Sequence, residues 1–290
     1  MSTSEYQLAS PTGAALFGRA WLPAATPRAV VCLVHGFGEH SGRYQTVADF
    51  LAQREIAVLA YDQRGHGRSP GARGAVASYS RLLDDVGALL EEARRRFGGL
   101  PRFLYGHSMG GGEVLRYAIE RQPSVTGVVA TSPWLELPNE LPPWQIALAA
   151  TLCAIAPGVA LPRQDLDSHK LSHQEPATRA YDADPLVHHR VTARLFWGCR
   201  ASGRWTLAHA GQLRLPVLLL HGSADVVTSP AASRRFAQRA GAWCRYREWE
   251  GLLHELHQEA QAPEVLACIA GWLAERTAAV STIAHPQEPA

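Results

Sequence analysis

Residues 102–112 read RFLYGHSMGGG, and this stretch decides the fold. Its apolar residues 103–105 predict a buried strand, and residues 113–121 predict a helix after it. Between them lies Gly106-x-Ser108-x-Gly110, a pattern typical of a sharp turn from a strand into a helix. The turning residue is strained there, so its neighbours two positions away must be small. Because such a pattern also occurs as a plain glycine turn, the remaining chain must supply a base, an acid and an oxyanion hole.

Ser108 stands at the apex of this predicted turn. Its hydroxyl would project from the sheet edge at a helix N-terminus, where the helix dipole favours developing negative charge. We therefore expect Ser108 to be a nucleophile if partners for it are found.

The composition bounds the class of protein. The 290 residues allow one large domain or a domain with an insertion, and 47% hydrophobic with 19% charged residues indicate a packed core. The net charge is +2, Lys170 is the single lysine, and the arginines are scattered among acidic residues. Without a basic block, we expect no nucleic-acid partner.

Five cysteines are widely spaced, odd in number and free of any C-x-x-C pair. They predict free thiols in a reducing compartment, with neither a disulfide framework nor a metal site. Residues 1–10 are polar and lack the layout of a signal peptide, and the longest apolar run, 146–156, is too short to cross a bilayer of about 30 Å. We expect a cytoplasmic protein and leave a peripheral membrane contact open.

The order of predicted elements is that of an α/β fold. Two alternating segments within residues 5–22 predict an antiparallel hairpin at the edge of the sheet. The chain then alternates between apolar strand patterns and helical patterns, which predicts a mostly parallel sheet with helices on both faces. The predicted strands are 29–34, 56–61, 103–105, 125–131, 216–220 and 244–249, and the predicted helices are 44–54, 78–97, 113–121, 235–240 and 263–276.

One connection is too long for a simple helical crossover. Residues 134–215 are rich in apolar and aromatic side chains and show no strand pattern. They predict a helical cap inserted over the carboxyl ends of the strands, within a core made of residues 1–133 and 216–277, with a flexible tail over 278–290. The apolar segment 141–161 of this cap fits two arrangements: a helix packed on most sides, or a helix that faces lipid.

Two later strands end in residues that suit a hydrolytic triad. Asp225 follows the strand at 216–220, and His254 follows the strand at 244–249. The order Ser108, Asp225, His254 is the one found in α/β-hydrolases, in which the histidine takes the serine proton and the carboxylate orients the histidine. Taken singly, Asp225 would be a turn residue and His254 a capping or surface histidine, and His257 and Glu255 compete for the last roles.

An oxyanion hole requires two backbone N–H donors. One is expected from Met109, directly after the nucleophile, and the other from Phe37 in the loop His35-Gly36-Phe37-Gly38. That loop could also be a glycine turn that merely reverses the chain.

Five blocks in order give the chain a specific resemblance. HGFGEHSGRY at 35–44, DQRGHGRS at 62–69, GHSMG at 106–110, HGSAD at 221–225 and EGLLH at 250–254 resemble the monoacylglycerol lipase and lysophospholipase family of α/β-hydrolases, which carries the serine aminopeptidase S33-type domain name. The resemblance implies hydrolysis of a fatty-acyl monoester of glycerol without a cofactor. It also implies a mobile apolar cap that forms an acyl tunnel and makes transient contact with a membrane surface.

The same resemblance implies roles for single residues. Arg43 matches an arginine that helps bind the glycerol head, and Tyr181 matches a cap tyrosine near the same polar pocket. Ala177 stands where the family has a glutamate, which puts recognition of the glycerol head in question, and Glu175 is nearby but out of register. Three residues of the second block also match, and we interpret them mainly as loop-stabilising groups: Asp62, Arg64 and His66.

The sequence thus predicts a serine ester hydrolase that cleaves monoacylglycerol-like lipids through an acyl-enzyme on Ser108. A lysophospholipase or a short-chain carboxylesterase would use the same triad. A lipid-binding protein of this fold without activity is the remaining alternative, although such proteins commonly lose a triad residue and this chain has all three. Peptidase activity has little support, because nothing resembles an anionic pocket for a free amino terminus.

Overall fold

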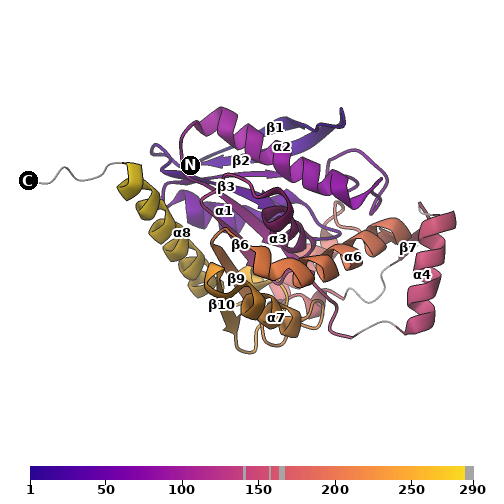
Figure 1. Ribbon diagram of the computed structural model, residues 1–290. Coiled ribbons are helices and arrows are strands. Elements are labelled where there is room, and N and C mark those ends of the chain that lie inside the picture. The colour runs from indigo at the N-terminus through magenta and orange to yellow at the C-terminus, as the bar shows by residue number, and fades with distance from the viewer. Residues whose placement is uncertain (140–141, 157, 163–166, 285–290) are drawn as a thin grey trace, which may run out of the picture.

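An eight-stranded sheet in the order β1-β2-β4-β3-β5-β6-β9-β10 forms the centre of the molecule (Figure 1). The computed structural model describes residues 1–139, 142–156, 158–162 and 167–284. The strands of this sheet are β1 (Ser2–Ala9), β2 (Ala15–Leu22), β3 (Ala29–Val34), β4 (Ile56–Tyr61), β5 (Arg102–His107), β6 (Gly127–Thr131), β9 (Val217–Gly222) and β10 (Cys244–Trp249).

The first two strands form the predicted antiparallel hairpin, with Ser2 opposite Leu22, and β2 pairs antiparallel with β4. All the other pairs are parallel. Strands β3, β4, β6 and β9 are buried along their whole length, as expected for apolar strands that are covered on both faces. The predicted α/β fold with a mostly parallel sheet is therefore confirmed.

Helices cover both faces of the sheet (Figure 1). Residues of α1 and α8 pack on one face, and residues of α2, α3 and α7 pack on the other. Helix α2 shows why these segments are helical: its buried side chains recur every three or four residues, and Gly98, with φ of +54°, ends it. The α-helices are α1 (Gln45–Ala52), α2 (Tyr79–Phe97), α3 (Ser108–Arg121), α4 (Pro143–Ile155), α5 (Glu175–Ala183), α6 (Ala193–His209), α7 (Pro230–Ala240) and α8 (Ala262–Ala284).

The long connection between β6 and β9 contains α4, α5 and α6, together with two strands, β7 (Ala160–Pro162) and β8 (Arg190–Thr192), that pair antiparallel. Two short strands thus lie in a segment whose sequence shows no obvious strand pattern. A strand of three residues is too short to show a two-residue alternation. Helix α6 contributes to two hydrophobic clusters. Leu207 is buried in the core cluster beside the sheet, whereas Cys199 packs in a second cluster with Trp134 and Met109. The cap boundaries at 134 and 215 stay a prediction.

The closing helix α8 continues to Ala284, beyond residue 276 where the sequence pattern ended it. Ala278 and Ala279 favour this continuation of the helix, and the flexible tail over 278–290 stays a prediction. Residues 285–290 lie outside the described part of the chain. Within that described part, none of the helices combines the length and the apolar character needed to cross a bilayer.

Candidate active site

Ser108 is the first residue of α3 and has a φ of +53°, the strained conformation expected at a strand-to-helix turn. The two flanking glycines are required by close backbone contacts. A Cβ atom at Gly106 would lie 2.3 Å from the carbonyl oxygen of Gly110, and one at Gly110 would lie 2.3 Å from that of Val34. The predicted need for small residues two positions from Ser108 is confirmed.

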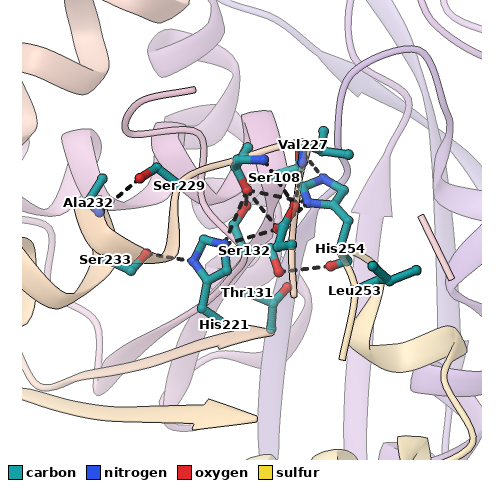
Figure 2. Close-up of polar contacts among 12 residues, drawn as sticks. Ser108, Thr131, Ser132, His221, Val227, Ser229, Ala232, Ser233, Leu253 and His254 are labelled. Carbon is teal, nitrogen blue, oxygen red and sulfur yellow. Dashed lines mark hydrogen bonds and ion pairs between the residues drawn. The ribbon is translucent and has the colours of Figure 1, made fainter. Parts of the chain in front are cut away.

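The structure brings Ser108, His254 and Asp225 into one hydrogen-bonded line. Figure 2 shows Ser108 and His254 within it. The Nε2 atom of His254 lies 2.9 Å from Ser108 Oγ, and its Nδ1 atom lies 2.7 Å from Asp225 Oδ2. Each residue follows the carboxyl end of a strand, β5, β9 or β10, so the parallel sheet gathers side chains that are up to 146 residues apart. The geometry is that of a serine activated by an oriented imidazole.

The carboxylate of Asp225 is buried and accepts hydrogen bonds on both oxygens. The backbone N–H groups of Val227 and Thr228 donate to Oδ1 at 2.7 and 3.0 Å. The Oδ2 atom faces His254, the hydroxyl of Thr228 at 3.0 Å and His221 Nε2 at 3.0 Å. Burial raises the pKa of Asp225, but attraction to His254 and the hydrogen bonds from His221 and His254 outweigh it and hold the pKa well below its usual range. The residue is therefore an anion at neutral pH.

His254 is held at both its ring and its backbone. Burial lowers the pKa of its imidazole, but the charge and hydrogen bond of Asp225 outweigh burial, so the pKa lies above its ordinary value. The hydroxyl of Ser132 donates to the His254 carbonyl oxygen at 2.8 Å. Ser132 itself has a φ of +44°, a second strained residue at this edge of the sheet. An imidazole fixed in this way suits proton transfer to and from Ser108.

The two backbone segments predicted to form an oxyanion hole lie against each other. A Cβ atom at Gly36 would lie 3.1 Å from Ser108 Cβ, so the loop that carries Phe37 packs on the turn. The N–H group of Met109 belongs to the first turn of α3, where backbone donors have no partner within the helix. The Phe37 loop is held from the other side by His188, whose N–H donates to the Gly38 carbonyl oxygen at 2.8 Å.

Ser108 opens into a pocket of about 450 Å³ with an apolar side and a polar side. Trp134, Leu137 and Leu171 line the apolar side. A second pocket of about 430 Å³ shares Trp134 and Leu137 with the first and extends toward Phe196 of α6. The polar side of the first pocket consists of Glu39, Arg43, Tyr181 and Glu255.

Arg43 joins two buried carboxylates. Its Nη1 and Nη2 atoms donate to both oxygens of Glu255 at 2.6 and 2.7 Å, and Nη1 also donates to Glu39 at 3.0 Å. Burial raises the pKa of Glu255, but Arg43 outweighs this and lowers it, so the pair is ionic. The Tyr181 ring lies over the guanidinium, with its centroid 4.7 Å from Arg43 Cζ. Both residues predicted to bind substrate thus line the pocket, and Glu255 is engaged as the partner of Arg43.

The remaining candidates are placed away from Ser108. His257 is buried and stacks on Tyr44 with ring centroids 4.9 Å apart, and neither of its ring nitrogens bonds to a group in the described chain. It is His254, and not His257, that contacts Ser108. Asp62 accepts from Ser41 and from the Arg68 N–H, and Arg64 pairs with Asp85. These bonds, and that of His66 Nδ1 with the Arg64 carbonyl, confirm loop-stabilising roles for the second block.

Sequence reasoning missed three residues of this site: His221, Thr228 and Ser132. His221 stands in the block HGSAD, four residues before Asp225, and that spacing was the available signal. Thr228 lies three residues after Asp225, in the turn that bonds its carboxylate. The bond from Ser132 to His254 joins residues 122 positions apart, and no local pattern announces it.

The comparisons with known proteins agree with this geometry. The family model described as "Serine aminopeptidase, S33" matches residues 25–261. The chain is 33% identical to the monoacylglycerol lipase of Mycolicibacterium smegmatis over 93% of its length and 96% of the relative, and 32% identical to the monoglyceride lipase of Homo sapiens over 96% and 93%. It superimposes on the crystal structure of Paleococcus ferrophilus monoacylglycerol lipase with a TM-score of 0.82 and 36% identity, covering 90% of this chain and 99% of that one. The chain therefore belongs to the serine aminopeptidase S33 family of α/β-hydrolases and is a carboxylic ester hydrolase.

Proposed function

We propose that this protein hydrolyses monoacylglycerol-like lipids to a fatty acid and glycerol through an acyl-enzyme on Ser108. The observation that carries the proposal is the line from Ser108 Oγ through His254 to Asp225, which opens into a pocket with one apolar and one polar side. An ester of a long acyl chain with a small polyol likewise has one apolar part and one polar part, which match the two sides of the pocket.

In the first half of the reaction His254 Nε2 takes the hydroxyl proton as Ser108 Oγ bonds to the ester carbonyl carbon. The carbonyl oxygen becomes an oxyanion that the N–H groups of Phe37 and Met109 stabilise. The anionic Asp225 stabilises the imidazolium of His254. When the C–O bond to glycerol breaks, His254 returns the proton to the leaving oxygen, and the acyl group stays on Ser108.

In the second half a water molecule replaces glycerol. His254 takes a proton from this water as its oxygen bonds to the acyl carbon, and the same N–H groups hold the second oxyanion. The bond from carbon to Ser108 Oγ then breaks and the serine regains its proton, which releases the fatty acid. The side chains and backbone N–H groups of the protein, the ester and one water molecule account for every bond made or broken.

The polar side of the pocket would bind the glycerol head. Glu39 and Glu255 retain acceptor capacity for hydroxyl donors, and the Tyr181 hydroxyl is a further partner. Arg43 acts chiefly by keeping the two carboxylates in place. The acyl chain would follow Trp134 and Leu137 into the second pocket, toward Phe196.

Substrate profiling of the purified protein tests the proposal. We expect monoacylglycerols of medium to long chain to give a higher kcat/KM than lysophosphatidylcholine of equal chain length or p-nitrophenyl butyrate. The apolar pockets reward acyl length over the butyrate, at about 0.8 kcal/mol for each buried methylene. The carboxylates of Glu39 and Glu255 on the polar side accept from glycerol hydroxyls and repel a phosphate. A series in chain length on both head groups, with Ser108→Ala as the blank, gives the comparison. A maximum on p-nitrophenyl butyrate or on the phospholipid would contradict the assignment.

One observation favours a lysophospholipase as the second candidate. Ala177 lines an open space of about 780 Å³ on the far side of Arg43, together with Arg19 and His40. Arg19 forms no ion pair with any carboxylate in the described part of the chain. A head group larger than glycerol would find room and one cation there. The head-group comparison above decides between the two candidates.

Exposed apolar side chains on α4 support a transient contact of this helix with a lipid surface. Its Trp144, Leu148 and Ile155 are 65%, 48% and 75% exposed, and their spacing places them on one helix face. The whole helix contains no charged residue. Figure 1 shows α4 at the right-hand edge beside α6, away from the sheet. This exposure supports the second of the two arrangements that the sequence allowed, a helix that faces lipid. An uncharged helix with an exposed tryptophan suits the polar boundary of a bilayer.

Trp144→Glu is expected to weaken binding to phosphatidylcholine vesicles about 30-fold, because about 2 kcal/mol of apolar burial is lost at the surface. Hydrolysis of soluble p-nitrophenyl butyrate should be unchanged. Trp243, which is 40% exposed beside α7, provides the matched control Trp243→Glu. Sedimentation with vesicles measures both variants. Equal loss of binding in the two, or none in Trp144→Glu, would exclude this face as the contact.

A further inference from the structure

A second imidazole reaches the carboxylate that orients His254. His221 is fully buried at the end of β9, close to Ser233 (Figure 2). Its Nε2 atom lies 3.0 Å from the same oxygen, Asp225 Oδ2, that contacts His254. The other ring nitrogen, Nδ1, lies 2.8 Å from the hydroxyl of Ser233 on α7. The contacts form one chain, from Ser233 through His221 and Asp225 to His254 and Ser108.

The direction of these hydrogen bonds follows from the carboxylate of Asp225. An ionised carboxylate only accepts, so His221 Nε2 carries a proton and donates to Oδ2. In a neutral imidazole Nδ1 is then an acceptor, and the Ser233 hydroxyl, 2.8 Å away, donates to it. Ser233 therefore supports the tautomer in which His221 donates to Asp225.

We infer that His221 and Ser233 are positioning residues for ester hydrolysis: they orient the Asp225 carboxylate so that Oδ2 faces His254 Nδ1. The inference rests on the proposed triad. A buried carboxylate needs donors to remain charged, and its orientation is set by where those donors lie. Backbone N–H groups fix Oδ1, and His221 is the side-chain donor that approaches Oδ2 from the side of α7.

This arrangement predicts a change in pH dependence. Without the His221 donor, the charge on Asp225 is less neutralised and attracts the His254 proton more strongly, so the pKa of His254 rises. Because His254 must be neutral to act as a base, the acid limb of kcat/KM should move to higher pH. The other titratable groups near His254 are unchanged in the variants: Glu39, His107, Glu255 and His257, with Glu248 the further carboxylate near His221.

The experiment compares His221→Phe, His221→Gln and Ser233→Ala on p-nitrophenyl butyrate from pH 5 to 9. We expect His221→Phe to lower kcat about tenfold, to leave KM unchanged and to move the acid limb upward by about half to one pH unit. In His221→Gln the amide nitrogen replaces the Nε2–H donor. This variant should therefore recover most of the wild-type kcat and most of the wild-type position of the acid limb. Ser233→Ala should produce a smaller shift in the same direction. His169→Gln, at an exposed histidine, is the control.

Two outcomes would overturn the inference. The first is a wild-type acid limb in His221→Phe and Ser233→Ala. The second is a fall in kcat that only parallels a fall in Tm and that glutamine does not rescue. If His221→Phe does not fold, Ser233→Ala and His221→Gln still decide, and the low-field proton resonance of the His254–Asp225 hydrogen bond gives a second readout. Full activity in Ser108→Ala would instead mean that the proposed function itself is wrong.

Discussion

Replacing Ser108 with alanine is expected to reduce kcat for ester hydrolysis by about 10⁵- to 10⁶-fold. The hydroxyl oxygen lies 2.9 Å from His254 Nε2, and without it no acyl-enzyme forms. Binding should survive, because the pocket walls and the backbone N–H groups remain. The measurements are kcat on p-nitrophenyl butyrate and on a medium-chain monoacylglycerol, together with Tm.

The matched control for this substitution is Ser124→Ala, at an exposed serine after α3. It should keep wild-type activity. The strained φ of +53° at position 108 gives alanine no advantage over serine, so Tm should change little. A Ser108→Ala protein that hydrolyses either ester at the wild-type rate would contradict the proposed mechanism.

Asp225→Asn is expected to lower kcat about 10⁴-fold, the size that the same change has in a serine protease triad. The asparagine amide can donate to His254 Nδ1, which favours the tautomer with its proton on Nε2. That nitrogen faces Ser108 at 2.9 Å and could no longer accept the serine proton. The buried site would also lose the charge that stabilises the imidazolium.

The residual activity of Asp225→Asn should also change its pH dependence in a definite direction. In the wild type burial lowers the pKa of His254, and Asp225 more than reverses this. When the carboxylate is removed, burial remains and the pKa falls below its ordinary value. The acid limb of kcat/KM should thus move to lower pH, opposite to the shift expected for His221→Phe. Asp49→Asn on α1 is the control, and an upward shift or a loss under tenfold would contradict the role of Asp225.

Much of the fold could be predicted, because its signals are local. Apolar runs marked β3 and β4 at their observed bounds, and the last predicted strand, 244–249, coincides with β10. Gly106 and Gly110 marked the strained turn through the backbone contacts that exclude a Cβ atom. The parallel sheet then implied that residues after β5, β9 and β10 meet at one edge. The positions of Ser108, Asp225 and His254 after these strands were therefore enough to predict that the three side chains meet.

The missed features are non-local or too short to show a pattern. Glu255 and Arg43 are 212 residues apart, so nothing in the sequence identifies their pairing. The donation of His221 to Asp225 depends on how β9 ends, and Ser233 contributes from a helix whose start at Pro230 the pattern did not locate. The exposed face of α4 could not be derived from composition, since an all-apolar helix has the same sequence whether protein or lipid covers it.

The central claim is that His254 activates Ser108 as the nucleophile. A fluorophosphonate probe tests it most directly, because such a probe phosphonylates only a serine whose proton a neighbouring base removes. Labelled wild-type protein, digested and analysed by mass spectrometry, should carry one adduct, on Ser108. The adduct should be absent from Ser108→Ala and much slower to form in Asp225→Asn. A protein that hydrolyses esters yet carries the adduct on another residue, or carries none, would contradict the account.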